Sequence, residues 1–386
     1  MTRHLTRRYV VKLKTPLLLL CCTFVWMLTT ATATRADQPA VGPRNQAGES
    51  SSFENVHVVK MPIRTKPRPN VGYRGMVGDI VVLKDNRLLL SYVKGSIQGR
   101  ISADRGKTWG NEFILVAAPK TRGNDSYAAP SFLRLSNGQL LMSYFYVSGA
   151  LPRFAQSYYR RSIDDGRTWG DQLIMTPHVG YILVHNDKPI QLSSGRLIAP
   201  YERELTEEGG DHRGYVSSVF YSDDNGYSWH KSKNEINVLP IEAQEPHVVE
   251  LKDERLMMLC RTYSGFVVRA YSSDQGTTWT KGQPVRELKL SSHSSALNVK
   301  RIPGTGDLLL LRSTGDGTQG LRSPFVSVIS KDEGQTWIHT RAIGSDPDND
   351  YGYPCLTFVD DMALISYHQR DGLHVARISI EWFYEK

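Results

Sequence analysis

Short runs of hydrophobic, β-forming residues alternate with polar turns along most of the chain, and no stretch of any length shows helical periodicity. Residues 130–144 illustrate the unit: two apolar runs separated by Asn137–Gly138, a strong signal for a β-hairpin. A third run and then a fourth follow the pair. We therefore expect antiparallel units of four strands. The paired runs recur at 78–92, 187–201, 246–260, 296–312 and 354–367, which makes six units.

An octet of the form Ser-x-Asp-x-Gly-x-Thr-Trp follows the third strand in five units, first at Ser102 to Trp109. We expect its aspartate to accept hydrogen bonds from backbone N–H groups two residues on. We also expect its glycine to adopt a left-handed backbone conformation and its tryptophan to be buried. A calcium loop is the alternative, but the bidentate glutamate and alternate oxygen ligands are absent. The period predicts one unit copied around a ring. The aspartates are Asp104, Asp164, Asp224, Asp274 and Asp332, spaced 60, 60, 50 and 58 residues apart.

These features predict an all-β fold: a six-bladed β-propeller of four-stranded antiparallel blades that covers residues 53–386. The sixth unit lacks an octet and is one strand short. Residues 55–61 alternate like a strand before the first blade, so we expect them to pair with the sixth blade and close the ring. This closure removes two open sheet edges. We expect the propeller to be a monomer.

Residues 1–33 have the three regions of a secretory signal peptide. Basic residues come first, an apolar run follows at 16–28, and Ala31 and Ala33 supply small residues for cleavage. The apolar run, at about 13 residues, is too short to span a bilayer. Residues 34–52 are polar, with Pro, Gly and Ser, and are expected to form a mobile leader. We predict export to the periplasm or the medium, with no membrane span after signal removal.

Removal of the signal changes the charge and the cysteine content. The whole chain carries +8, and the signal holds five basic and no acidic residues, so 8 − 5 leaves +3. This small excess gives no support for nucleic-acid binding. Cys260 and Cys355 remain, each in an apolar strand pattern, so we expect buried thiols and no disulfide framework. No pair of histidines has zinc-site spacing, and we expect neither a metal nor a cofactor.

Two chemically capable residues precede a proline at the same point of the strand pattern. Glu245 comes before Pro246 in the fourth unit, and Tyr353 comes before Pro354 in the sixth. This position lies at the entry of the innermost strand, so we expect both side chains to face the ring axis, where they can converge. The alternative is that both are ordinary strand-entry residues, because Glu-Pro and Tyr-Pro dipeptides are common there.

The octet resembles the Asp-box of the sialidase superfamily, and other spacings resemble the catalytic set of that family. Glu245 opens a Glu-x-x-Val-Val-Glu-Leu pattern with Arg261 sixteen residues later, and Arg322 lies eight residues before Ser330. Tyr353 opens a Tyr-Pro-Cys-Leu-Thr segment that is similar to the nucleophile motif, with proline in place of serine. The resemblance implies that Tyr353 is the nucleophile, that Glu245 is its base, and that both arginines bind a substrate carboxylate.

Such a set suits an acidic sugar such as sialic acid, and the likeness extends over residues 55–386. The sialic acid carboxylate is attached to the anomeric carbon, so guanidinium forks can bind it bidentately and fix the ring. A carboxylate nucleophile would be repelled there, whereas tyrosine approaches neutral and needs a base, because its ordinary pKa is about 10. Sialidases are an exception to the two-carboxylate rule for glycosidases. His185 and His247 could contact sugar hydroxyls; a solvated or core role is the alternative.

Two parts of the family pattern are changed. Arg74 is the nearest candidate for the first family arginine, about two residues out of register. The family acid/base aspartate follows the first strand pair, but residues 91–100 contain no acidic residue. Asp79, Asp125 and Asp187 enter the first three blades at the same end of the ring, and Asp187 is our first choice for the catalytic acid, with the other two as substrate contacts. The alternative for each is a turn aspartate bonded to its own backbone.

We predict an exported exo-glycosidase of sialidase type, which hydrolyses a terminal sialic acid or a related acidic sugar from a glycan or glycoconjugate with retention of configuration. A hydrolase for another acidic-sugar linkage is an alternative, because the first-blade loop differs. A carbohydrate-binding propeller that kept the arginines and lost turnover is another. A protein-interaction scaffold has no need for Glu245, Arg261, Arg322 and Tyr353 at these offsets.

Overall fold

The computed structural model describes residues 40–41, 53–63, 72–120, 125–149, 153–206, 212–290 and 294–385. The predicted signal peptide lies outside these residues, as does the predicted leader apart from 40–41. None of the described helices is long and apolar enough to cross a membrane. Strands supply nearly all the regular structure of the described residues. The short 3-10 helices are η1 (Gly72–Gly75), η2 (Thr318–Gly320) and η3 (Glu381–Tyr384).

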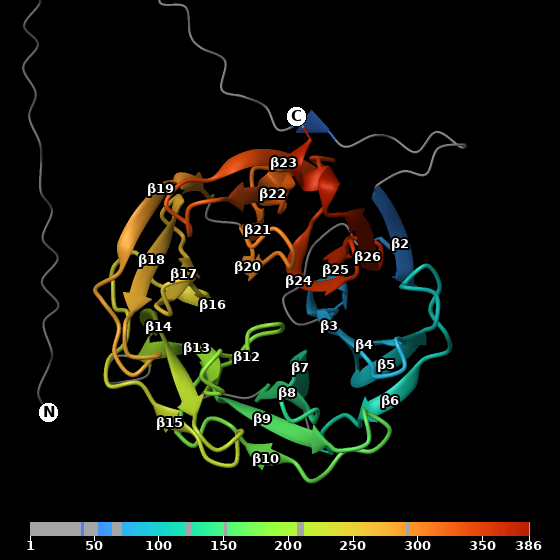
Figure 1. The fold of residues 1–386 in the computed structure, drawn as a ribbon, viewed down its shortest axis with the longest axis horizontal. Helices are drawn as coiled ribbons and strands as arrows, with labels where there is room; N and C mark the ends of the chain where they lie inside the picture. Colours follow the sequence, from blue (N-terminus) through green and yellow to red (C-terminus); the bar gives the residue numbers. More distant parts are fainter. Residues whose placement is uncertain are drawn as a thin grey trace, which may run out of the picture. The chain divides into compact units, whose positions relative to one another are not determined.

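Six sheets follow one another around a ring, which confirms the predicted six-bladed propeller (Figure 1). The first blade contains β3 (Gly78–Val82), β4 (Leu88–Lys94), β5 (Ser96–Ser102) and β6 (Phe113–Val116). The second contains β7 (Ser126–Arg134), β8 (Leu140–Val147), β9 (Ala155–Ser162) and β10 (Leu173–Ile174). The third contains β11 (Ile182–Leu183), β12 (Ile190–Gln191), β13 (Leu197–Thr206), β14 (His212–Ser222) and β15 (His230–Lys231). The fourth blade contains β16 (Gln244–Glu250), β17 (Leu256–Arg261), β18 (Phe266–Ser272) and β19 (Gln283–Lys289). The fifth contains β20 (Asn298–Arg301), β21 (Leu308–Ser313), β22 (Phe325–Ser330), β23 (Ile338–Gly344) and β1 (Ala40–Val41). The sixth contains β24 (Gly352–Val359), β25 (Met362–Gln369), β26 (Gly372–Ser379) and β2 (Phe53–Lys60).

The hydrophobic core is divided among the seams between neighbouring blades. In β4, Leu88 and Leu90 pack with Leu364 of the sixth blade, while Leu89, which points to the opposite face, packs with Leu140 of the second blade. All five side chains are buried. A sheet covered on both faces needs apolar residues at successive positions. This is why the second strand of each blade appears in the sequence as an uninterrupted hydrophobic run.

The octets form hairpin staples between the third and fourth strands, as predicted. In the first copy, Ser102 Oγ donates to Asp104 Oδ1 at 2.8 Å and accepts the N–H of Gly106 at 2.8 Å. Asp104 accepts the N–H of Thr108 at 2.9 Å and its hydroxyl at 2.5 Å. The aspartate therefore binds the backbone four residues on, and the predicted offset of two was wrong. Gly106 is left-handed, with φ of 82°, and the same bonds recur in the other copies.

The ring is closed by pairing of the two ends of the propeller. Strand β2 pairs antiparallel with β26, in a register that runs from Phe53 opposite Ile378 to Lys60 opposite Gly372. This confirms that the segment before the first blade completes the sixth. Strand β1 adds a short parallel pair to β23 of the fifth blade. Because β2 covers β26, the sixth blade has four strands, as the first blade does.

Candidate active site

Several inner strands begin with the same backbone irregularity. Ala129, Asp187, Glu245 and Tyr353 have φ values of 50°, 53°, 45° and 52°, in the left-handed region that non-glycine residues rarely occupy. In the second, fourth and sixth blades, the pairing of the inner strand with its neighbour shifts register near this residue. Bulges of this kind redirect a side chain, and strained non-glycine residues concentrate at functional sites. Equivalent positions in the sequence pattern thus share one special conformation.

The structure brings Glu245 and Tyr353 into contact. The Tyr353 hydroxyl donates a hydrogen bond to Glu245 Oε1, and Arg261 Nη1 lies 2.6 Å from Oε2 in a buried ion pair. Burial alone would raise the pKa of Glu245, but the charges of Arg261 and His185 and the Tyr353 hydrogen bond together lower it. Burial and the Glu245 charge raise the pKa of Tyr353. At neutral pH the pair is a carboxylate that accepts from a neutral phenol, which is the arrangement a general base requires.

Two further arginines lie beside the phenol ring. Arg322 Cζ is 5.2 Å from the Tyr353 ring centroid. Arg74, on η1, places Nε and Nη2 at 2.5 and 3.0 Å from the two carboxylate oxygens of Asp350. The backbone N–H of Arg322 donates to the same buried carboxylate at 2.8 Å. Asp350 therefore ties the two arginines together. No sequence pattern predicted this residue; its one available signal is its place three positions before Tyr353.

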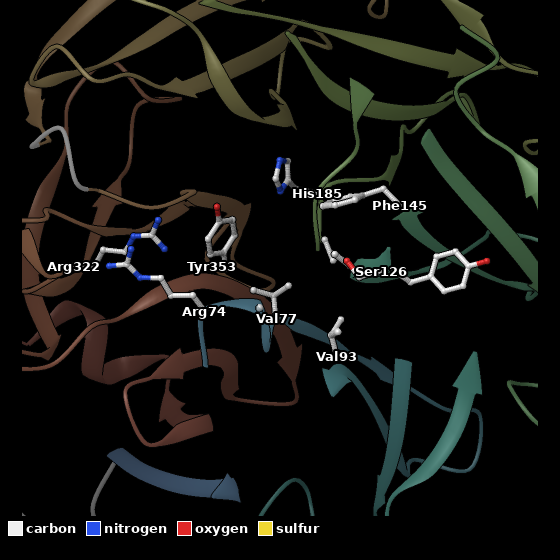
Figure 2. A pocket seen from close by; sticks show the side chains of 12 residues that line it. Arg74, Val77, Val93, Ser126, Phe145, His185, Arg322 and Tyr353 are labelled. Carbon is white, nitrogen blue, oxygen red and sulfur yellow. The ribbon is translucent and has the colours of Figure 1, made fainter. Parts of the chain in front are cut away.

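A cavity of about 110 Å³ opens beside these residues. Figure 2 shows Arg74 and Arg322 on one side of Tyr353, with His185 and Phe145 on the other. The part of the wall formed by the described residues contains no carboxylate. The cavity thus combines a cationic end with a largely apolar remainder, which suits a ligand with one anionic group. The other lining residues are Gly75, Val77, Val93, Ser126, Tyr127, Ala128 and Ala129.

His185, which the sequence suggested for hydroxyl binding, is a central part of this wall. Its ring stacks on Tyr353 with centroids 6.0 Å apart, and it meets Phe145 edge-on at 5.4 Å. His185 Nε2 lies 3.1 Å from Oε1 of Glu202 in β13, and Glu202 Oε2 accepts the backbone N–H of Glu245 at 2.8 Å. Glu202 was not predicted. Its available signal was its place after the apolar run 197–201, as the first of three consecutive charged residues.

Asp187, our first choice for the catalytic acid, does not line the cavity. Its buried carboxylate forms an ion pair with Lys300 through Oδ1. Its Oδ2 accepts hydrogen bonds of 2.7 Å from the Asn298 side chain and from the Leu356 N–H. These contacts connect the third, fifth and sixth blades at the centre of the ring. Both oxygens are occupied in this way, so we withdraw the proton-donor role for Asp187 and regard it as a structural residue.

The other two candidate aspartates also bind protein groups. Asp79 is buried and accepts the backbone N–H of Phe132 in the second blade at 2.7 Å, and burial raises its pKa well above the ordinary value. Asp125 accepts the hydroxyl of Tyr146 at 2.6 Å. Asp125 directly precedes Ser126, which lines the cavity, but neither aspartate does so itself. Asp79 therefore connects the first blade to the second, and Asp125 binds Tyr146 within the second blade. Neither aspartate lies on the cavity wall.

Potential metal ligands in the described residues gather at two places, and neither cluster lines the cavity. In one cluster Asp187 is already paired with Lys300, and in the other His374 Nε2 lies 2.8 Å from Asp371 Oδ1. Cys260 and Cys355 are buried free thiols in β17 and β24, as predicted. The two clusters are Asp79, Asp187 and Cys355, and His57, Asp371 and His374.

Known protein families agree with this architecture. Residues 94–365 match the family model described as a BNR repeat-like domain. This chain belongs to that family. The BNR propeller is similar to a sialidase from Bacteroides fragilis, with 30% identity over 57% of this chain and 40% of the relative. It is also similar to a sialidase from Micromonospora viridifaciens, with 24% identity over 79% of this chain and 50% of the relative.

The solved structures that resemble this BNR propeller include an intramolecular trans-sialidase from Ruminococcus gnavus in complex with oseltamivir carboxylate. The TM-score is 0.64 at 17% identity, and the match covers 82% of this chain and 98% of that chain. At this identity the likeness concerns the fold. The chain spans 40% and 50% of the lengths of the two curated relatives.

Proposed function

We propose that this protein is an exported exo-glycosidase of sialidase type that releases a terminal sialic acid or a related acidic sugar from a glycoconjugate. The observation that carries the proposal is the hydrogen bond from Tyr353 to Glu245, beside a cavity that also contains Arg74 and Arg322. A neutral nucleophile, its base and cationic groups in one place meet the needs of a sugar with a carboxylate on its reacting carbon. The sialidase names of the two curated relatives support this class of reaction.

The sugar carboxylate binds to the guanidinium groups of Arg74, Arg261 and Arg322. Arg74 is held by Asp350 and Arg261 by Glu245, so these groups are oriented before substrate arrives and lose little entropy on binding. Burial and the nearby positive arginines lower the pKa of Arg322. An anion placed beside Arg322 relieves this accumulation of positive charge, which favours an acidic sugar over a neutral one.

In the first step, Tyr353 Oη attacks the anomeric carbon while its proton passes to Glu245. The glycosidic C–O bond breaks, its electron pair stays on the leaving oxygen, and that oxygen takes up a proton. In the second step, water attacks the same carbon and gives up a proton to the group that protonated the leaving oxygen, the tyrosyl C–O bond breaks, and Tyr353 recovers its proton from Glu245. Two inversions at one carbon give net retention. The raised pKa of Tyr353 makes its hydrogen-bonded base necessary.

Export and a monomeric state belong to the same proposal. The basic, apolar and small-residue segments within 1–33 support secretion to the periplasm or the medium. All the proposed catalytic groups come from one closed ring, so a single chain suffices for activity.

Replacement of Tyr353 tests the proposed function. The mature chain from residue 34 is incubated with 4-nitrophenyl sialoside, and release of nitrophenol is followed. Wild-type turnover is expected, and Tyr353→Phe should reduce it by at least about a thousandfold, because the attacking oxygen is lost. Tyr351→Phe is the matched control: Tyr351 is a buried tyrosine two positions away that does not line the cavity, and its replacement should leave turnover at the wild-type level.

Other results would redirect the assignment. Full activity of Tyr353→Phe contradicts the nucleophile. Binding of the sialoside without turnover, lost in Arg261→Ala, supports the carbohydrate-binding alternative. Turnover of an aryl uronide in place of the sialoside supports a hydrolase for another acidic sugar, an alternative that the changed first-blade loop at 91–100 favours.

A further inference from the structure

The proposed reaction needs a proton for the leaving oxygen, and the cavity wall restricts its source. Within the described residues, no carboxylate lines the cavity. The two arginines keep their protons at all working pH values. The hydroxyl of Ser126 is too weak an acid, and that of Tyr127 is directed to Gln172 Oε1 at 3.3 Å. Because Tyr353 supplies the nucleophile, His185 is the wall residue that can exchange a proton near neutral pH.

A buried carboxylate orients His185. Glu202 Oε1 lies 3.1 Å from Nε2 of the imidazole, and its Oε2 accepts the backbone N–H of Glu245 at 2.8 Å, so both oxygens are fixed. An acceptor at this distance favours the tautomer in which Nε2 keeps its proton and donates a hydrogen bond to Glu202, so that Nδ1 is left to exchange a proton, as the buried aspartate of a serine-protease triad does for its histidine. Nδ1 of His185 has no hydrogen-bond partner in the described part of the chain. Phe145 packs edge-on against the ring and limits its rotation.

The position of His185 relative to the nucleophile also fits. The imidazole and the Tyr353 phenol stack with an interplanar angle of 23° and centroids 6.0 Å apart. Figure 2 shows His185 and Tyr353 on the same cavity, with the arginines on the far side of the phenol. A sugar carboxylate at the arginines would place its leaving group toward the imidazole.

We propose that His185, held by Glu202, is the general acid and base of this enzyme, because residues 91–100 of the first blade supply no acidic side chain for that role. This inference rests on the proposed function. As Tyr353 Oη bonds to the anomeric carbon, the glycosidic C–O bond breaks and the leaving oxygen takes the proton from His185 Nδ1. The proton of Tyr353 goes to Glu245. In the second step neutral His185 takes a proton from the attacking water. Glu202 touches no substrate and is a positioning residue.

Leaving-group dependence tests the role of His185. The wild type and His185→Gln are compared on two sialosides of the same sugar: a 4-nitrophenyl sialoside, whose leaving group departs without protonation, and an alkyl sialoside, whose leaving group needs a proton. For the alkyl substrate kcat/KM should fall by about 10² to 10⁴, whereas the loss for the nitrophenyl substrate should stay below about tenfold. His230→Gln, a replacement of an exposed histidine outside the cavity, should leave both values unchanged.

The pH profile provides a second measurement that a merely structural role would not move. The titratable groups that face His185 are Glu202 from β13, Glu245 from β16 and Tyr353 from β24. Loss of the His185 proton should give the wild type an alkaline limb in kcat/KM for the alkyl substrate. His185→Gln should abolish this alkaline limb. Glu202→Gln should shift the pH at which the limb begins, while the variant keeps its selectivity for the nitrophenyl over the alkyl substrate.

Each contrary outcome is decisive. Equal losses on both substrates, or full alkyl activity in His185→Gln, would overturn the assignment while the proposed function stands. If His185→Gln does not fold, absence of an alkaline limb in the wild type would overturn it. A wild type without turnover on either substrate would overturn the proposed function and this inference together.

Discussion

At the residue scale, Glu245 joins three parts of the candidate site. Its Oε1 accepts from Tyr353, its Oε2 pairs with Arg261, and its backbone N–H donates to Glu202. It achieves this with φ of 45°, a conformation that costs free energy for any residue with a side chain. A buried ion pair adds little to the stability of a protein, but removal of one partner strongly destabilises the protein. The chemistry of the site therefore explains this arrangement best, because the arrangement itself costs the folded state free energy.

Glu245→Gln should destabilise the protein in a pH-dependent way. At neutral pH the free energy of unfolding should fall by about 3 to 5 kcal/mol, because buried Arg261 loses its partner. Folding lowers the pKa of Glu245, so its contribution is complete above the ordinary pKa of a glutamate and is lost as pH falls through the lowered value. The difference between wild type and variant should therefore shrink on acidification. Urea unfolding between about pH 7 and about pH 3 measures this difference.

Glu250→Gln provides the control for this series. Glu250 lies on the same strand, β16, but is only partly buried and bonds to Ser193 near the surface. Its replacement should change stability by less than about 1 kcal/mol at any pH. A difference between wild type and Glu245→Gln that stays constant with pH would show that the carboxylate charge is not what stabilises the pair.

At the element scale, the sequence predicts most where the physical cause is local. Asn137–Gly138 and the octet around Asp104 act within a few residues, so strand pairs and blades could be assigned directly. The shared register of Glu245 and Tyr353 followed from the same pattern. Contacts between distant segments could not be predicted, because they depend on how neighbouring blades pack. These contacts are Asp350 with Arg322, Glu202 with Glu245, and Asp187 with Lys300, separated by 28, 43 and 113 residues.

The octets should contribute stability without contributing to catalysis. In the third copy, Asp224 accepts from the Ser222 hydroxyl and from the N–H and hydroxyl of Ser228, at 2.6 to 2.9 Å. Asp224→Ala removes these bonds, so the free energy of unfolding should fall by about 1 to 3 kcal/mol, at about 1 kcal/mol for each hydrogen bond. Chemical denaturation measures this loss, and kcat per folded molecule should not change.

The neighbouring residue provides a matched control for the octet. Asp223 is exposed and forms a surface ion pair with Arg196 at 2.7 Å. Asp223→Ala should cost at most about 1 kcal/mol, because solvent screens such pairs. Equal losses in the two variants would contradict the staple, and a fall in kcat without a change in stability would place the octet in the catalytic machinery.

At the scale of the whole molecule, we expect the propeller to be stable only as a closed ring. Each blade has its two faces covered by neighbours, so one missing strand exposes both an open sheet edge and part of a seam. Strand β2 fills that place in the sixth blade: its Val59 is buried in the seam with the first blade, and Phe53 packs on Trp382 with ring centroids 5.6 Å apart. The candidate nucleophile Tyr353 lies on β24, the innermost strand of the same sheet.

Deletion of β2 should therefore unfold the protein rather than alter its kinetics. A chain that begins at residue 62 should lose more than about 5 kcal/mol, comparable to the whole stability of many domains, and should aggregate through the exposed edge of β26. A chain that begins at residue 53 keeps β2 and should melt close to the full mature chain, since it lacks only the leader and the two-residue strand β1. Thermal unfolding and size-exclusion chromatography distinguish the two. A soluble, monomeric chain from residue 62 with an unchanged melting temperature would show that the ring does not need its N-terminal strand, and the stability of the site would then have to come from the inner strands alone.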